Sequence, residues 1–260
     1  MLLVGMLDSP YVRRAAVTGT LLGLEFEHRS VSVFRHMDEF RAVNPLIKAP
    51  SLVTDDGTVI SESLLIIQHF EDLAGRSLRP VEASARMRDL SLTGIGIVAA
   101  DKAVAIEYER KRPEAQRYAP WQERIVAQLH TALDLLDGAA GRGELTAGPE
   151  LLPSDIAAAI AWGFCRFVIP DFAPVRALAG PCGTGARLRG ARRLQAMADR
   201  PGIEAEIPKS GGFAFTMPKI AAAAAPGPSC NPAGRAHLPE RVREESPPGR
   251  SRASSADSRR

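Results

Sequence analysis

Apolar and polar positions change their period several times within the first 75 residues. Leu2-Leu3-Val4 is a short apolar run typical of a buried strand, whereas the apolar positions from Pro10 to Gly23 suit a helix packed against a sheet. Pro10 fits the first turn of a helix because its missing N–H would be unpaired there in any case. The whole pattern predicts strand 2–4, helix 10–23, strand 25–33, helix 37–43, strand 49–54, a turn at 55–57, strand 58–60, and a helix capped by Ser61 that ends at Leu73 before Gly75.

The pattern of strands disappears after a short linker at residues 76–81. Helical periodicity dominates the rest, apart from a predicted loop at 138–149. One of the predicted helices is rich in alanine and nearly all apolar, which implies burial on every side. The predicted helices cover residues 83–112, 116–136, 154–168 and 187–199.

Together the two patterns predict an α/β region followed by an all-α region. The order of the first region is typical of a thioredoxin-like α/β unit, with parallel strands first and a closing hairpin. We therefore predict a thioredoxin-like domain at residues 1–76 and a helical bundle domain at 83–209. Residues 210–260 are dominated by Pro, Gly, Ser and Arg, and we predict a disordered tail because such a segment buries too little apolar surface to offset its ordering entropy.

Charge and cysteine content narrow the function classes. Residues 214–260 hold eight Lys or Arg against four Asp or Glu, whereas the first 213 residues hold 25 basic and 26 acidic side chains. The body therefore offers no electrostatic reason to expect a nucleic-acid partner. No apolar run is long enough for a membrane span, the N-terminus is unlike a signal peptide, and Cys165, Cys182 and Cys230 form no CxxC pair, so we expect a cytoplasmic protein without a membrane partner.

Three features of the first region suggest a ligand site. Ser9 stands between the first strand and the first helix, where free N–H groups and the helix dipole stabilise a thiolate to which a hydroxyl can donate. Ala49-Pro50 opens a strand, and a cis bond there would turn the backbone of Ala49 toward a ligand. Glu62-Ser63 opens the next helix, where the hydroxyl suits a carboxylate and Glu62 suits an ammonium group. Together they describe a pocket for an extended zwitterionic peptide that bears a thiol.

These segments also carry a resemblance to a known family. "SPYVRR", "NPLIKAPSLVTDDGTVISES" and the helical region behind them resemble the cytosolic glutathione transferases of bacterial type, over residues 1–209. The resemblance implies that Ser9 is the catalytic residue that hydrogen-bonds the glutathione thiolate. It also implies that Lys48, Ala49, Pro50, Glu62 and Ser63 bind glutathione, that the electrophile site includes Tyr11, Tyr108 and Arg112, and that the protein is a homodimer active in detoxification.

One position departs from the family pattern. A hydroxyl residue normally stands three residues before the Asp that opens the buried helix, but Leu152 occupies that place ahead of Asp155. Ser154 is then the local candidate for a cap.

Each assignment has a structural alternative that the sequence leaves open. Ser9 can be a plain helix N-cap, Pro50 an ordinary trans proline, and Glu62-Ser63 a first-turn acid with a cap. Tyr11 is either a second thiol partner or a ring packed at the domain interface. Arg13 and Arg14 are interpreted as a surface or interface pair.

The spacing of the remaining residues gives no indication of a metal centre. The histidines form no HxxxH or HExxH pattern, and Cys165 on the apolar helix is expected to be a buried, inert thiol. We therefore expect an enzyme with glutathione as co-substrate, no metal and a small electrophile as partner. The alternatives are a non-catalytic binding or regulatory protein, or a glutathione-dependent isomerase or peroxidase on the same fold.

Overall fold

The computed structural model describes residues 1–145 and 150–172, which all lie within one compact unit. Its first part is a four-stranded sheet with the strand order β2-β1-β3-β4. β1 (Leu2–Val4) pairs in parallel with β2 (Glu27–Arg29) and antiparallel with β3 (Ser51–Val53), which in turn pairs antiparallel with β4 (Val59–Ser61). The predicted thioredoxin-like arrangement, parallel strands and then a hairpin, is confirmed.

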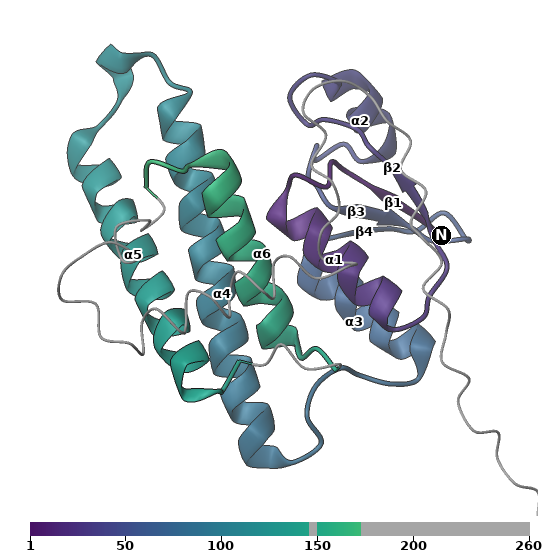
Figure 1. Cartoon of the computed structure of the whole chain (residues 1–260). Helices are drawn as coiled ribbons and strands as arrows, with labels where there is room; N and C mark the ends of the chain where they lie inside the picture. Colours follow the sequence, from purple (N-terminus) through teal and green to yellow (C-terminus); the bar gives the residue numbers. More distant parts are fainter. Residues whose placement is uncertain (146–149, 173–260) are drawn as a thin grey trace, which may run out of the picture. The chain divides into compact units, whose positions relative to one another are not determined.

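Helices cover both faces of this sheet (Figure 1). Neighbouring residues of a strand point to opposite faces, and β1 follows this rule. Leu3 packs in a core with α1 (Pro10–Leu21) and α3 (Ser63–Ala74), whereas Val4 packs with Phe40 of α2 (Met37–Val43). β1 is therefore the buried centre of the sheet, and its carboxyl end leads directly into the loop that carries Ser9.

The predicted bounds of the N-terminal elements are partly right. The helix at 37–43 is confirmed to the residue, whereas β2 is shorter than the predicted strand at 25–33. The prediction that Ser61 caps α3 is wrong, because Ser61 ends β4 and Glu62 takes the N-cap position. Gly75 ends α3 with φ 60°, a left-handed conformation that glycine adopts without steric cost.

Only helices follow within the described residues: α4 (Ala83–Arg110), a 3-10 turn at Glu114–Gln116, α5 (Ala119–Arg142) and α6 (Pro153–Val168). α5 extends through Gly138, so the predicted loop at 138–149 is wrong at its start; residues 146–149 lie outside the described part. The predicted helix at 187–199 and the predicted tail at 210–260 also lie outside it. The domain bounds 1–76 and 83–209 stay predictions.

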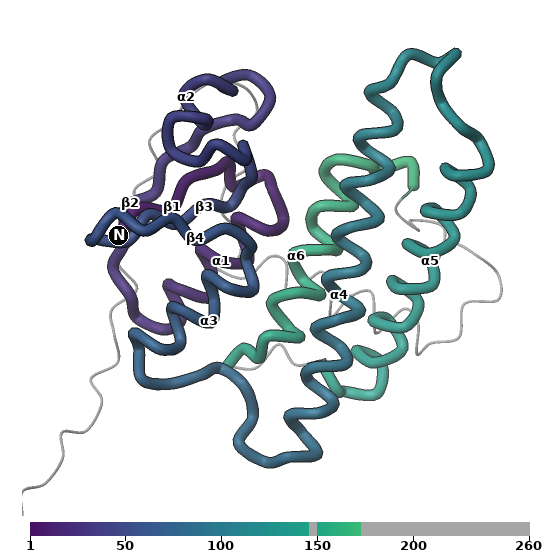
Figure 2. The backbone as a smooth tube through the Cα atoms, turned by 180° about the vertical axis from the view of Figure 1, so that it is seen from behind, coloured from purple at the N-terminus to yellow at the C-terminus, as the bar shows by residue number. Residues whose placement is uncertain are grey.

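α6 packs against both α4 and α1 (Figure 2). Ser154 through Trp162 are all buried, as the apolar pattern predicts, although Arg166 and Phe167 near the end of the helix are exposed. Gly96 allows α4 to approach closely, because a Cβ on it would lie 2.8 Å from the Cβ of Ala157 and 2.9 Å from its carbonyl carbon. The helix that is apolar on nearly every side is thus enclosed between the sheet region and the other helices.

The start of α6 is capped from another helix. The Asp155 carboxylate accepts a hydrogen bond from Leu152 N at 2.9 Å, but Leu152 has no hydroxyl with which to complete a capping box. Instead, buried Asp89 of α4 accepts a hydrogen bond from Ser154 N at 2.9 Å. The expectation of a local Ser154 cap is wrong, since the Ser154 hydroxyl is buried without a hydrogen-bond partner. None of the described helices is both long and apolar enough to span a membrane.

Candidate functional site

A cavity of about 800 Å³ is lined by the segments that follow β1 and β2, the segment that precedes β3, and residues of α4 and α6. This volume falls within the range usual for small-molecule sites. Of the residues predicted for the site, the cavity is lined by Ser9, Tyr11, Lys48, Ala49 and Tyr108. Five positions from three separate parts of the sequence thus meet at one opening.

Ser9 occupies the N-cap position of α1 without acting as a side-chain cap. Its backbone is extended, its carbonyl accepts a hydrogen bond from Arg13 N at 3.0 Å, and its hydroxyl makes no capping bond. The hydroxyl is therefore free to donate to a group in the cavity. That group would also face the partial positive charge of the α1 N-terminus.

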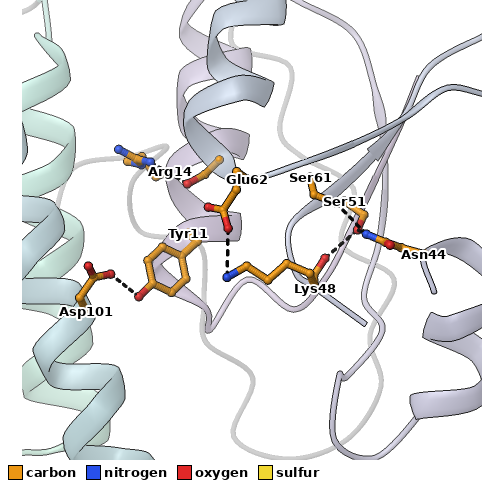
Figure 3. Close-up of polar contacts among 9 residues, drawn as sticks. Tyr11, Arg14, Asn44, Lys48, Ser51, Ser61, Glu62 and Asp101 are labelled. Carbon is orange, nitrogen blue, oxygen red and sulfur yellow. Dashed lines mark hydrogen bonds and ion pairs between the residues drawn. The ribbon is translucent and has the colours of Figure 1, made fainter. Parts of the chain in front are cut away.

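Tyr11 directs its hydroxyl away from this position. The phenol donates a hydrogen bond of 2.6 Å to Asp101 Oδ1 of α4 (Figure 3). Burial, with a further contribution from Asp101, raises the pKa of Tyr11 above its usual range. A phenol held in its neutral form and already donating is a poor thiol partner, whereas its ring still lines the cavity.

The peptide bond between Ala49 and Pro50 is cis, so the alternative of an ordinary trans proline, which the sequence left open, is wrong. Ala49 lines the cavity, while Pro50 is buried and does not. The preceding loop is held by Asn44, whose amide donates to the hydroxyls of Ser51 and Ser61, both at 2.8 Å. Ser51 in turn donates to the carbonyl oxygen of Lys48 at 2.7 Å (Figure 3), which fixes the backbone beside Ala49.

Two of the predicted glutathione-binding residues pair with each other. Lys48 Nζ lies 3.0 Å from Glu62 Oε1, and Figure 3 shows the lysine side chain crossing to the start of α3. Glu62 has φ 74°, a left-handed value that costs a residue with a side chain about 1–3 kcal/mol. Such strain gathers at ligand sites, and here it projects Glu62, more than half exposed, from the helix N-terminus.

Ser63 is 2% exposed, and its hydroxyl accepts a hydrogen bond of 2.6 Å from Arg14 Nη2. Arg14 and the adjacent Arg13 are 7% and 8% exposed, so the surface alternative of the predicted surface or interface pair is wrong. Arg13 donates through Nε to the carbonyl oxygen of Leu7 at 2.9 Å, within the loop before Ser9. Both guanidinium groups thus donate hydrogen bonds to buried acceptors near Ser9 and at the start of α3. Two adjacent cations on a helix do not by themselves predict such buried contacts.

The far wall of the cavity is aromatic. Phe34 meets the ring of Tyr108 edge to face with centroids 5.4 Å apart, and Lys111 Nζ lies 5.4 Å from the centroid of Phe34. Phe164 and Phe167 of α6 extend the same wall. Arg112 is not among the lining residues; its Nε lies 3.4 Å from Glu109 Oε2 on the side of α4.

The cavity can hold an anion as well as an apolar group. Arg35 lies at the rim, and its guanidinium donates only to the Met6 sulfur, at 3.6 Å, among the residues the structure describes. Sulfur is a weak acceptor, so this cation is available to a ligand. In the described ranges, 1–145 and 150–172, no group of three His, Cys, Asp or Glu side chains could hold a metal ion.

Comparison with known proteins decides the family. Residues 3–78 match the family described as "Glutathione S-transferase, N-terminal domain". The chain is also 30% identical over 171 residues to the uncharacterized GST-like protein YibF of Escherichia coli K12, an alignment that covers 64% of this chain and 83% of YibF. The chain belongs to the glutathione transferase family.

Solved structures agree with this assignment at the level of fold. A glutathione transferase from Methylobacterium radiotolerans, in complex with glutathione sulfonate, has a TM-score of 0.67 and 24% identity, covering 83% of this chain and 98% of its own. A family member from Pseudomonas fluorescens Pf-5, with bound S-(propanoic acid)-glutathione, has a TM-score of 0.63 and 26% identity, covering 81% and 100%.

The sequence analysis did not predict several residues of this candidate site. Phe34 and Arg35 lie in a predicted loop, and nothing in their spacing marks them as lining a cavity. The one available signal was their place directly after a strand of the parallel pair, since ligands of α/β sheets bind beyond the carboxyl ends of such strands. Arg14 and Asp101 gave no signal, because their partners are distant in the chain.

Proposed function

We propose that this protein is a glutathione transferase that activates the glutathione thiol for attack on a small electrophile. The observation that supports the proposal is the position of Ser9, which lines the cavity at the N-terminus of α1 and whose hydroxyl has no capping role. The hydroxyl and the helix dipole both favour a thiolate over a thiol. Thiolates at helix N-termini have a pKa below the usual value of about 8.5, so the bound thiol would be ionised near neutral pH.

Polar and charged groups in the cavity and at the neighbouring start of α3 suit the ends of the tripeptide, although Glu62 and Ser63 are not themselves lining residues. Glutathione carries an ammonium and a carboxylate on its γ-glutamyl end and a second carboxylate on its glycyl end. Glu62 suits the ammonium, and Ser63 at the start of α3 suits the adjacent carboxylate. Lys48 and Arg35, two cations that line the cavity, suit the glycyl carboxylate. Ala49 would pair with the cysteinyl backbone.

Without a ligand, Lys48 and Glu62 satisfy each other. Glutathione would replace that ion pair with two of its own, since its ammonium takes Glu62 and a carboxylate takes Lys48. Both side chains are more than half exposed, so little free energy opposes the exchange.

The acceptor side of the proposal depends on the aromatic wall. Tyr108, Phe34 and Phe167 are each exposed toward solvent to a substantial degree and favour a flat, apolar electrophile. Attack by the thiolate forms a carbon–sulfur bond. In a substitution the bond to the leaving group breaks and that group departs as an anion with the electron pair, whereas in an addition a π bond breaks and the anion formed takes a proton from water.

The test compares Ser9→Ala with Tyr11→Phe. We expect Ser9→Ala to lower kcat/KM for conjugation of a generic aryl halide at least tenfold and to raise the pKa of the bound thiol, measured by the ultraviolet absorbance of the thiolate. Tyr11→Phe is the matched control, because it also removes one hydroxyl from the cavity lining, and it should leave that pKa unchanged. A raised thiol pKa in Tyr11→Phe but not in Ser9→Ala would show that Tyr11, rather than Ser9, hydrogen-bonds the thiolate. Glutathione binding without turnover would support the non-catalytic alternative instead.

Assembly and location belong to the same proposal. A homodimer is supported by large apolar side chains on α3 and α4 that stay exposed in the single chain, Leu64, Leu65 and Met87. Light scattering at micromolar concentration gives the mass directly. The odd cysteine count without a paired motif supports a reducing cytoplasm, where a role in detoxification would be exercised.

A further inference from the structure

Arg14 is a buried cation with no carboxylate beside it. Within the described residues no Asp or Glu lies at ion-pair distance from its guanidinium. Arg14 is 7% exposed, and its guanidinium donates a hydrogen bond to the neutral Ser63 hydroxyl. Buried charges are normally paired, because burial without a partner is costly. This burial lowers the pKa of Arg14, while the negative charges of Asp101 and Glu62 act on it from a greater distance and oppose the shift.

The position of Arg14 adds to the uncompensated positive charge. Arg14 Nη2 reaches the first residue of α3, where the helix already presents its partial positive end. Two positive charges of different origin therefore meet at one buried point. An anion bound there would be attracted by both.

The direction of the hydrogen bond adds a second argument. A serine hydroxyl has one proton to donate and two lone pairs to accept with. At Ser63 one lone pair is taken by Arg14, so the hydroxyl proton points elsewhere and remains available to an acceptor. A hydroxyl that accepts from a cation is also polarised toward being a stronger donor.

We infer that Arg14 is a positioning residue that sets the Ser63 hydroxyl as a donor to the α-carboxylate of the γ-glutamyl group and supplies the buried positive charge for that anion. The inference rests on the proposed glutathione-binding function. It makes Arg14 a determinant of selectivity for γ-glutamyl thiols over thiols that lack this group. Arg14 itself need not touch the ligand.

A purely structural role for Arg14 predicts something different. Its hydrogen bond ties α1 to α3, so its loss could lower stability and weaken every ligand of the cavity alike. A positioning role predicts loss of affinity only for ligands that carry the γ-glutamyl carboxylate. The two are separated by a comparison of ligands rather than by activity.

The experiment measures dissociation constants by titration calorimetry for glutathione, γ-glutamylcysteine and cysteinylglycine on the full chain. The variants are Arg14→Met and Ser63→Ala, with Arg13→Met as matched control, since Arg13 is an adjacent, equally buried arginine on the same helix that binds the Leu7 carbonyl instead. Circular dichroism at each temperature of measurement establishes the folded fraction.

We expect Arg14→Met to raise the dissociation constants of glutathione and γ-glutamylcysteine about tenfold, the usual effect of losing one charge-assisted hydrogen bond. That of cysteinylglycine should change less than about twofold. Ser63→Ala should have a similar effect, and the double variant should be little worse than either single one, because the two residues act on one contact. Arg14→Lys keeps the charge and should recover part of the affinity; it also serves as the test if Arg14→Met does not fold.

Three results would overturn the inference. They are an unchanged glutathione affinity in Arg14→Met, equal weakening of cysteinylglycine, or the same selective loss in Arg13→Met. If Arg14→Lys binds glutathione as tightly as the wild type does and Arg14→Met binds it more weakly, the result supports the role of the positive charge. Failure of the wild-type protein to bind glutathione at all would refute the proposed function itself, a distinct outcome.

Discussion

Replacing Asp89 with alanine should destabilise the protein through a helix that Asp89 does not belong to. Asp89 lies on α4, is 3% exposed, and accepts the hydrogen bond from Ser154 N at the start of α6. The first N–H groups of a helix have no partner within the helix and must be satisfied from outside. In Asp89→Ala the N–H of Ser154, itself 1% exposed, would be left buried and unpaired.

The size of the effect follows from two opposing contributions. An unsatisfied buried N–H costs about 1–3 kcal/mol, and loss of a side-chain cap alone costs about 1 kcal/mol. In the opposite direction, Asp89 Oδ2 is buried without a partner, so removing the carboxylate relieves part of its own burial cost. We expect a net loss of about 2 kcal/mol in the free energy of unfolding.

Two further variants isolate the cause. Asp89→Asn keeps an oxygen acceptor for Ser154 N and should cost less than about 1 kcal/mol. Leu152→Thr supplies the hydroxyl that is missing at the N-cap position and, added to Asp89→Ala, should return about 1 kcal/mol. The Asp155 carboxylate already accepts from Leu152 N, so the hydroxyl would complete the reciprocal pair.

Urea denaturation followed by circular dichroism measures all of these variants, with the slope of the transition as a check that the unfolded state is unchanged. A loss below about 0.5 kcal/mol in Asp89→Ala would refute the reasoning. So would a loss in Asp89→Asn as large as that in Asp89→Ala, because the negative charge, rather than the cap, would then be responsible.

Three other predictions concern single contacts. Tyr11→Phe should lower the free energy of unfolding by about 1 kcal/mol at neutral pH. Because burial raises the pKa of Tyr11 above the value of about 10 in the unfolded chain, wild-type stability should also fall as pH rises past about 10. Urea titrations across that pH range should show that this part of the fall is absent in the variant. Gly96→Ala should destabilise by about 2 kcal/mol in the same assay, because its Cβ would lie within 3 Å of Ala157, unless α4 and α6 separate without cost. Glu62→Gln should raise the glutathione dissociation constant about tenfold in calorimetry, and an unchanged value would remove Glu62 from the ammonium site.

Local sequence patterns predict the bounds of a helix where neighbouring residues determine them, and fail where tertiary packing does. The helix at 37–43 is confirmed at both ends, and its C-terminal end has a local cause, because Pro45 directly follows the C-cap Asn44. α5 was predicted too short because Gly138 and Gly141 look like breakers, yet the helix continues past them to Gly143, where φ 79° ends it. Buried Ala139 and Ala140 supply the packing that overrides the glycine cost.

The residues of the candidate site also differ in whether a local sequence pattern predicts them. Ser9, Ala49 and Glu62 could be chosen from the sequence because each stands at the end of an element, where backbone groups are exposed to a ligand. Arg14 could not, since its partner Ser63 lies 49 positions away, and the same holds outside the site for Asp89, whose partner Ser154 lies 65 positions away. An interior contact of this kind leaves no period or spacing in the chain to detect.

Ser9 shows why the sequence left its role open and how the structure narrows it. Serine before a proline-initiated helix satisfies the rule for a cap and the requirement for a thiol partner equally well. The two roles differ only in where the hydroxyl bond goes, and α1 starts without it. Because Pro10 has no N–H, the first turn of α1 has one fewer donor to satisfy, and the need for a capping hydroxyl is smaller. The proline next to Ser9 therefore helps to leave that hydroxyl free for the cavity.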